Sequence, residues 1–101
     1  MSGISIIAKR LRQARERTGL SQKDLGIEAG INEFTASARM NFYEQGTNTP
    51  NLLTVTHIGA VLHILAPYFY CEDEQLADLI LKYSTLGEAQ KKRLRALVDK
   101  V

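Results

Sequence analysis

The sequence predicts an all-α protein, and three observations lead to this prediction. Apolar residues recur at spacings of three and four along most of the chain, which is the period of an amphipathic α-helix. Glycines and helix-capping residues divide the chain into short helical segments. No segment has the apolar–polar alternation of a β-strand. With 101 residues, 45% of them hydrophobic, the chain has room for one compact domain with a short helical appendage.

The first helix is expected over about residues 4–18, and Gly19 ends it because glycine easily adopts the left-handed conformation found there. Its apolar stripe consists of Ile4, Ile7, Ala8, Leu11 and Ala14. Its other faces carry Lys9, Arg10, Arg12, Gln13, Glu16 and Arg17. Two interpretations of these basic side chains stay open: a solvated helix face, or contacts with backbone phosphates.

A second, short helix is expected between Ser21 and Gly30. Ser21 is a typical capping residue, and Asp24, three residues later, is suited to return a bond to the cap. Gly26 lies inside this helix, where glycine costs about 1 kcal/mol relative to alanine. A glycine at such a position indicates that another helix passes close to it.

A third helical stretch follows the turn at Asn32-Glu33 and ends at Gln45, before Gly46. Residues 46–51 contain Gly, Asn and Pro together and are the clearest loop in the chain. A fourth helix is expected over about residues 51–63. Six of its residues are directed toward a core: Leu52, Val55, Ile58, Ala60, Val61 and Leu62.

Two further elements complete the chain. Ala66-Pro67 begins a fifth element, because proline is favoured in the first turn of a helix, and its amphipathic pattern continues to about Ser84. A last, basic helix is expected over residues 88–101. Its apolar seam consists of Leu94, Leu97, Val98 and Val101.

The charge is distributed unevenly, although the net charge of +2 is too small to identify a partner. Six basic residues and one acid, Glu16, lie between Lys9 and Lys23, a local balance of +5. Residues 72–78 carry four acids and no base. A basic N-terminal half favours contact with a polyanion over the even charge of a purely solvated surface.

Other features of the sequence exclude several classes of protein. Cys71 is the only cysteine, so no intramolecular disulfide forms, and its aromatic neighbours indicate a packed thiol. No apolar stretch approaches the roughly 20 residues that span a membrane. The N-terminus has no export signal, which predicts a cytoplasmic protein.

An enzyme is not expected, because the titratable residues do not converge. His57 and His63 are six residues apart on or near one apolar helix and point to different faces. No cysteine or carboxylate stands at metal-ligand spacing, and no glycine loop would cradle a phosphate. The sequence therefore predicts no catalytic residues, metal, cofactor or small-molecule ligand.

The order of the short motifs is more specific than the helical pattern. The chain reads Leu11-Arg12-x-x-Arg15-x-x-x-Gly19-Leu20-Ser21-Gln22-x-x-Leu25-Gly26, then Gly30-Ile31, then Tyr43-Glu44-x-Gly46-x-x-x-Pro50. With this pattern, residues 8–70 resemble the lambda-repressor/Cro type (Xre-like) of helix-turn-helix transcriptional regulator. The resemblance implies a five-helix DNA-binding domain over residues 1–71, whose second motif helix enters the major groove of double-stranded DNA. Residues 72–101 then form a C-terminal helical extension.

One departure from the family pattern concerns the recognition helix. An insertion of about one helical turn lies within residues 31–35. Aligned backward from Glu44, Met40 and Tyr43 are buried anchors and Arg39 is exposed. Aligned forward from Gly30, Asn32, Glu33 and Thr35 lead the helix, and Arg39 falls at a buried anchor. We prefer the backward alignment, because an unpaired buried charge is strongly disfavoured.

The backward alignment gives the base-reading candidates. Arg39 can donate two bonds to guanine, and Asn41 can pair with adenine in the same bidentate way. Ser37 is a candidate for a base or a phosphate. The alternative for these residues is a solvated surface or partners within the helix.

The remaining candidates concern the DNA backbone and the fold. The resemblance makes Gln22 a phosphate or base-edge contact and Lys23 a phosphate contact, while Thr47 and Asn48 are expected at neighbouring phosphates. Glu44 is expected to pair with Arg12 or Arg15, as the corresponding acid does in similar domains.

Two alternatives to DNA binding stay open: a protein-interaction module, and an antitoxin-like protein that binds both a partner and its own operator. The DNA-binding interpretation also predicts a homodimer on palindromic half-sites, because one such domain contacts a single half-site. The extension either closes the core or supplies the dimer interface, and we favour an interface formed by Leu94, Leu97 and Val98.

Overall fold

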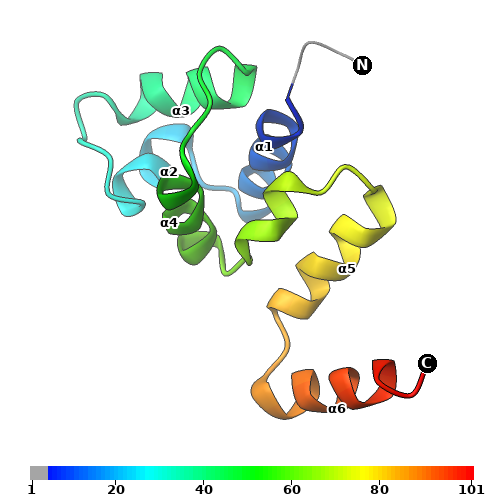
Figure 1. The fold of residues 1–101 in the computed structure, drawn as a ribbon. Coiled ribbons are helices and arrows are strands. Elements are labelled where there is room, and N and C mark those ends of the chain that lie inside the picture. The colour runs from blue at the N-terminus through cyan, green and yellow to red at the C-terminus, as the bar shows by residue number, and fades with distance from the viewer. Residues whose placement is uncertain (1–4) are drawn as a thin grey trace.

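The computed structural model describes residues 5–101 and contains six α-helices and one 3-10 helix within them (Figure 1). They are α1 (Ile6–Thr18), α2 (Gln22–Glu28), α3 (Ala36–Gln45), α4 (Leu52–Leu62), the 3-10 helix η1 (Ala66–Tyr70), α5 (Glu74–Ser84) and α6 (Glu88–Val98). No strand occurs within these residues, so the predicted all-α fold is confirmed. Ile4, expected on the first apolar stripe, lies outside the described residues.

Local capping interactions explain where most helices begin and end. Ser21 Oγ accepts a hydrogen bond from the Asp24 N–H at 3.0 Å, and Asn51 Oδ1 accepts one from the Thr54 N–H at 2.8 Å. Gly19 and Gly46 end α1 and α3 with φ angles of +78° and +77°, in the left-handed region that glycine tolerates. The expected breaks are therefore present, although α6 ends at Val98, three residues earlier than predicted.

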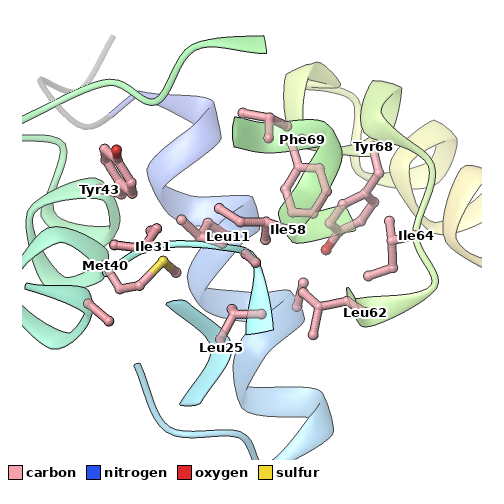
Figure 2. Packing of buried hydrophobic residues seen from close by; sticks show 14 of the residues in the cluster. Leu11, Leu25, Ile31, Met40, Tyr43, Ile58, Leu62, Ile64, Tyr68 and Phe69 are labelled. Atoms are coloured by element: carbon pink, nitrogen blue, oxygen red, sulfur yellow. The ribbon is translucent and has the colours of Figure 1, made fainter. Parts of the chain in front are cut away.

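The hydrophobic core is enclosed by α1, α2, α3, α4 and η1 (Figure 2). It is mainly aliphatic, with Phe69 and Tyr68 packed edge to face at one end. Side chains from five elements meet in it, among them Leu11, Leu25, Met40, Ile58, Leu62 and Phe69. These contacts hold α2 and α3 on one side of the molecule.

Two residues of α4 were wrongly predicted to lie in the core. Leu52 and Ala60 are exposed, whereas Val55, Ile58 and Leu62 form the buried stripe. Leu52 is the first residue of α4 and is 64% exposed. Ala60 lies two residues from both Ile58 and Leu62 and therefore points to the opposite face.

Arg10 is a second correction, because it is neither solvated nor available to a phosphate. Only 1% of it is exposed. Its guanidinium donates to the carbonyl oxygens of Cys71 and Glu72, at 2.9 and 3.2 Å, and to Glu74 Oε1 at 3.0 Å. The guanidinium also lies 5.7 Å from the centre of the Tyr68 ring. The segment after η1 folds back over α1 and buries this arginine.

Helices α5 and α6 form two arms beyond the core: α5 leads away from the core, and α6 turns off from the end of α5 (Figure 1). Ala77 of α5 is buried, and α5 packs against η1. No residue of α6 is buried among those described, so α6 does not close the core. Tyr83 links the two arms: its hydroxyl accepts a bond from Arg95 at 2.9 Å, and the Lys91 ammonium lies 5.2 Å from its ring centre.

No helix within residues 5–101 combines the length and the apolar character needed to cross a bilayer.

Candidate functional site

Gly26 of α2 lies in close contact with α3. A Cβ atom added to Gly26 would lie 2.9 Å from Ala36 Cβ and 3.1 Å from Met40 Cγ. Such spacing leaves no room for a side chain, so the expected tight helix pair is present. The two helices and the turn between them form a helix-turn-helix.

The insertion lies in the turn and lengthens neither helix. Gly30 has a φ of +94°, and the Ile31 N–H donates back to the Gly26 carbonyl at 2.9 Å. Asn32, Glu33 and Thr35 are exposed turn residues and do not lead a helix. Helix α3 begins at Ala36, with Met40 and Tyr43 buried and Arg39 exposed, as the backward alignment expects.

A buried ion pair joins α1 to α3. Both nitrogens of the Arg15 fork reach Glu44: Nε lies 2.5 Å from Oε2, and Nη2 lies 3.0 Å from Oε1. The Glu44 side chain is only 3% exposed. Its hydrogen bond is the main cause that raises the pKa of Arg15 above the ordinary value. The expected partner is thus Arg15, while Arg12 pairs with Glu16 on its own helix at 3.2 Å.

Gln22 and Asn41 are brought together across the two motif helices. Gln22 Nε2 donates to Asn41 Oδ1 at 3.3 Å and to Glu44 Oε1 at 3.1 Å. Gln45 Nε2 reaches the same Asn41 oxygen at 3.4 Å. Glu44 therefore also contacts the Gln22–Asn41 pair. Its negative charge is balanced by the positive charge of Arg15, so it adds no uncompensated charge beside Gln22 and Asn41.

Arg39 is held by its own helix. Its Nη2 donates to the Tyr43 hydroxyl at 2.7 Å, and the guanidinium carbon lies 5.7 Å from the Tyr43 ring centre. Tyr43 is buried, so the arginine rests on a fixed support. The guanidinium has five N–H donors, and this contact uses one of them. Sequence reasoning placed Tyr43 as an apolar anchor and missed the role of its hydroxyl.

The other candidates are exposed and stand apart from this cluster. Within residues 5–101 the structure records no side-chain hydrogen bond for four of them: Lys23, Ser37, Thr47 and Asn48. The backbone amides of Thr47 and Asn48 both donate to the Phe42 carbonyl, which ties the loop to the end of α3. A further residue that sequence reasoning missed is Phe34, an exposed aromatic in the turn, where no helical period draws attention to it.

This fold and its close helix pair define an all-α helix-turn-helix protein. The chain is similar to the solved structure of the transcriptional regulator BswR, with 44% sequence identity and a TM-score of 0.83 over 93% of each chain. At this identity and coverage, the chain belongs to the same family as that regulator. No protein-family model matches the chain, and the comparison with curated proteins found no match.

Proposed function

We propose that this protein is a transcriptional regulator of the lambda-repressor/Cro type that binds double-stranded DNA in the cytoplasm, with α3 in the major groove. The observation that carries the proposal is the presentation of α3. Its inner side is anchored by Met40 and Tyr43, while its outer side carries exposed Ser37 and Arg39. Kinship with a transcriptional regulator supports this function. Residues 1–71 form the DNA-binding unit, and no chemical step is performed.

Arg39 is the main base-reading residue in this proposal. A guanidinium donates bidentately to guanine O6 and N7, provided that its fork is held in one orientation. The bond to the Tyr43 hydroxyl and the contact with its ring supply that restraint. The restraint lowers the conformational entropy that the side chain loses on binding.

Asn41 is the second base-reading residue, and Gln22 prepares it. An asparagine reads adenine through its amide oxygen and nitrogen together. The 3.3 Å bond from Gln22 orients the amide of Asn41 before DNA arrives. The 3.4 Å bond from Gln45 to the same oxygen would then be replaced by a bond from the adenine amino group. Gln22 also lies at the start of α2, where backbone amides favour a phosphate. Lys23, Thr47 and Asn48 complete the contacts with the DNA backbone.

The test begins with selection of bound duplexes from a random pool at defined salt, because affinity for DNA depends strongly on salt. We expect a short sequence to be enriched. On that sequence, Arg39→Ala should weaken binding between about fivefold and 150-fold, the effect of one lost bidentate contact. On random duplexes its loss should be smaller. Gln22→Ala should weaken binding to all duplexes and, through Asn41, most at adenine.

Two matched variants separate base reading from charge. Arg39→Lys keeps the positive charge but loses the planar fork, so it should weaken binding to the selected sequence and leave binding to random duplexes unchanged. Tyr43→Phe removes only the hydroxyl that holds Arg39 and should produce an intermediate loss. Equal losses on selected and random duplexes for Arg39→Ala would contradict base reading. Failure of the wild type to enrich any sequence would favour a protein-interaction module.

The extension over residues 72–101 is proposed as the homodimer interface. An apolar groove of about 480 Å³ lies between α5 and α6 and is lined by Leu76, Leu79, Ile80, Tyr83, Leu94 and Val98. Helix α6 leaves its own apolar residues in solvent, with Leu97 63% and Val98 60% exposed. A second copy of the chain is the occupant we propose for this groove, because binding to two half-sites about 34 Å apart requires a two-fold dimer. Arg95 and Asp99 at the rim give a self-complementary pair of charges.

Light scattering tests the interface. Truncation before Gly87 should lower the oligomeric state, and Val98→Asp should do the same in the full chain. Ala96→Asp is the matched control, because Ala96 lies two residues away on the other face of α6. An unchanged mass after both truncation and Val98→Asp would reject this interface.

A further inference from the structure

Phe34 is exposed to an unusual degree for an aromatic residue. It is 89% exposed, and among the large hydrophobic residues of the described part of the chain only the terminal Val101 is more so. The half-exposed hydrophobics of the same helix pair, Ile27 and Phe42, are at 37% and 41%. Phe34 therefore contributes almost nothing to the hydrophobic core.

The turn that carries Phe34 is held at both ends. Ile31 and Ala36 are buried on either side of it. Within the turn, Asn32 Oδ1 accepts from the Phe34 N–H at 2.8 Å, and the Asn32 carbonyl accepts from the Thr35 N–H at 3.0 Å. The backbone of Phe34 is thus fixed and its side chain is exposed. The turn between α2 and α3 that carries it lies on the side of the molecule away from α5 and α6 (Figure 1).

Phe34 lies two residues before the N-terminus of α3, the helix that carries the candidate base-reading residues. We propose that Phe34 contacts the C5-methyl group of a thymine in the major groove, and so adds one position to the sequence that α3 reads. The inference rests on the proposed DNA binding by α3. It adds an apolar contact to a site whose other candidates, Ser37, Arg39 and Asn41, are all polar.

The chemistry of the partner follows from what Phe34 can offer. A phenyl ring has no hydrogen-bond donor or acceptor, and the thymine methyl is the apolar group that the major groove displays. Its neighbours in the turn, Asn32, Glu33 and Thr35, are polar and exposed, so Phe34 is the one apolar side chain that residues 32–35 present to solvent. The Glu33 carboxylate would repel a phosphate, which makes an apolar contact the favourable one for this turn.

The experiment combines a protein change with a single-methyl change in DNA. Each thymine of the selected sequence is replaced in turn by deoxyuridine, which lacks only the C5-methyl group. At one position the wild type should lose about fourfold in affinity, the factor that corresponds to burial of one methyl-sized group. Phe34→Ala should bind the thymine duplex as weakly as the wild type binds the deoxyuridine duplex. It should no longer distinguish the two, whereas Phe34→Leu should retain part of the distinction.

Leu53→Ala is the matched control, because Leu53 is an exposed apolar residue on α4 and should leave the methyl effect unchanged. The exposure of Phe34 also predicts unaltered thermal unfolding for Phe34→Ala. The inference is overturned if Phe34→Ala keeps the full sensitivity to the methyl group, loses affinity equally on every duplex, or binds like the wild type. Those results differ from a failure of DNA binding itself, in which the wild type selects no sequence.

Discussion

Gly26 sets the distance between α2 and α3. Replacement by alanine gains about 1 kcal/mol of helix propensity. The added methyl would overlap Ala36, however, and overpacking of this kind costs about 1–3 kcal/mol. We expect Gly26→Ala to lower the free energy of unfolding by about 1 kcal/mol in urea titrations and to reduce DNA binding further, because α3 is displaced. Gly87→Ala, where nothing lies closer to the added Cβ than 3.9 Å, should change unfolding little.

The ion pair of Glu44 with Arg15 gives a second prediction for single residues. Glu44→Ala leaves an arginine that is mostly buried without its partner, and breaking such a pair costs about 3 kcal/mol. Denaturant unfolding should show this loss. Glu16→Ala removes the exposed partner of Arg12 and should cost less than about 0.5 kcal/mol. Comparable losses for the two variants would contradict a structural role for Glu44.

Single residues were predictable from the sequence when their environment is local. The close contact at Gly26 was predicted because a glycine inside a short helix is visible locally. The pairing of Glu44 with an arginine of the first helix, 29 residues from Arg15, was predicted from the family resemblance and not from local pattern. The burial of Arg10 was not, since its acceptors at residues 71–74 lie more than 60 positions away along the chain. A helical period reports which face a residue occupies but not which distant segment covers that face.

For whole helices, the capping residues explain why the predicted boundaries were accurate. They also lead to a further prediction. Asn51 caps α4 through the Thr54 N–H, and Asn51→Ala should cost about 1 kcal/mol of unfolding free energy. Thr56→Ala, within the same helix, should be neutral or slightly stabilising, because alanine is the better helix former. Thermal unfolding of both variants measures the difference. An unaffected Asn51→Ala would mean that packing alone defines the start of α4.

Other properties of the elements depend on tertiary contacts and were less predictable. The sequence left two alignments open across residues 31–35, because turn and helix residues are mixed there. In the structure, residues 31–35 lie outside both α2 and α3. Ile31 at the start of this segment and Ala36 directly after it are buried in the core. The separation of the fifth element into η1 and α5 likewise follows from the fold-back of residues 71–73 over α1.

At the level of the molecule, Lys9 and Arg10 of α1 connect the core to the extension. Both donate to Glu74 at the start of α5, so one carboxylate receives two cations from α1. This contact between distant parts of the chain ties the start of α5 to α1, in addition to the packing of α5 against η1. In the proposed dimer, the same contact would determine how far apart the two copies of α3 lie.

The pH dependence of stability tests this connection. The hydrogen bonds from Lys9, and then from Arg10, lower the pKa of Glu74 below its ordinary value of 4.5. A carboxylate whose pKa is lowered on folding stabilises the fold above its unfolded value, and this contribution is lost as the pH falls through the lowered folded value. Glu74→Gln should therefore melt at a lower temperature than the wild type at pH 7. The difference should shrink below pH 4.5 and vanish once the pH has fallen through the lowered folded pKa of Glu74. The difference will be modest because Glu74 is exposed to solvent and screened. Glu88→Gln is the control variant, because the 4.0 Å pair of Glu88 with Lys91 lies within one helix and does not join α5 to α1. A difference for Glu74→Gln that persists at low pH, or that is absent at pH 7, would mean that the carboxylate does not hold α5 to α1.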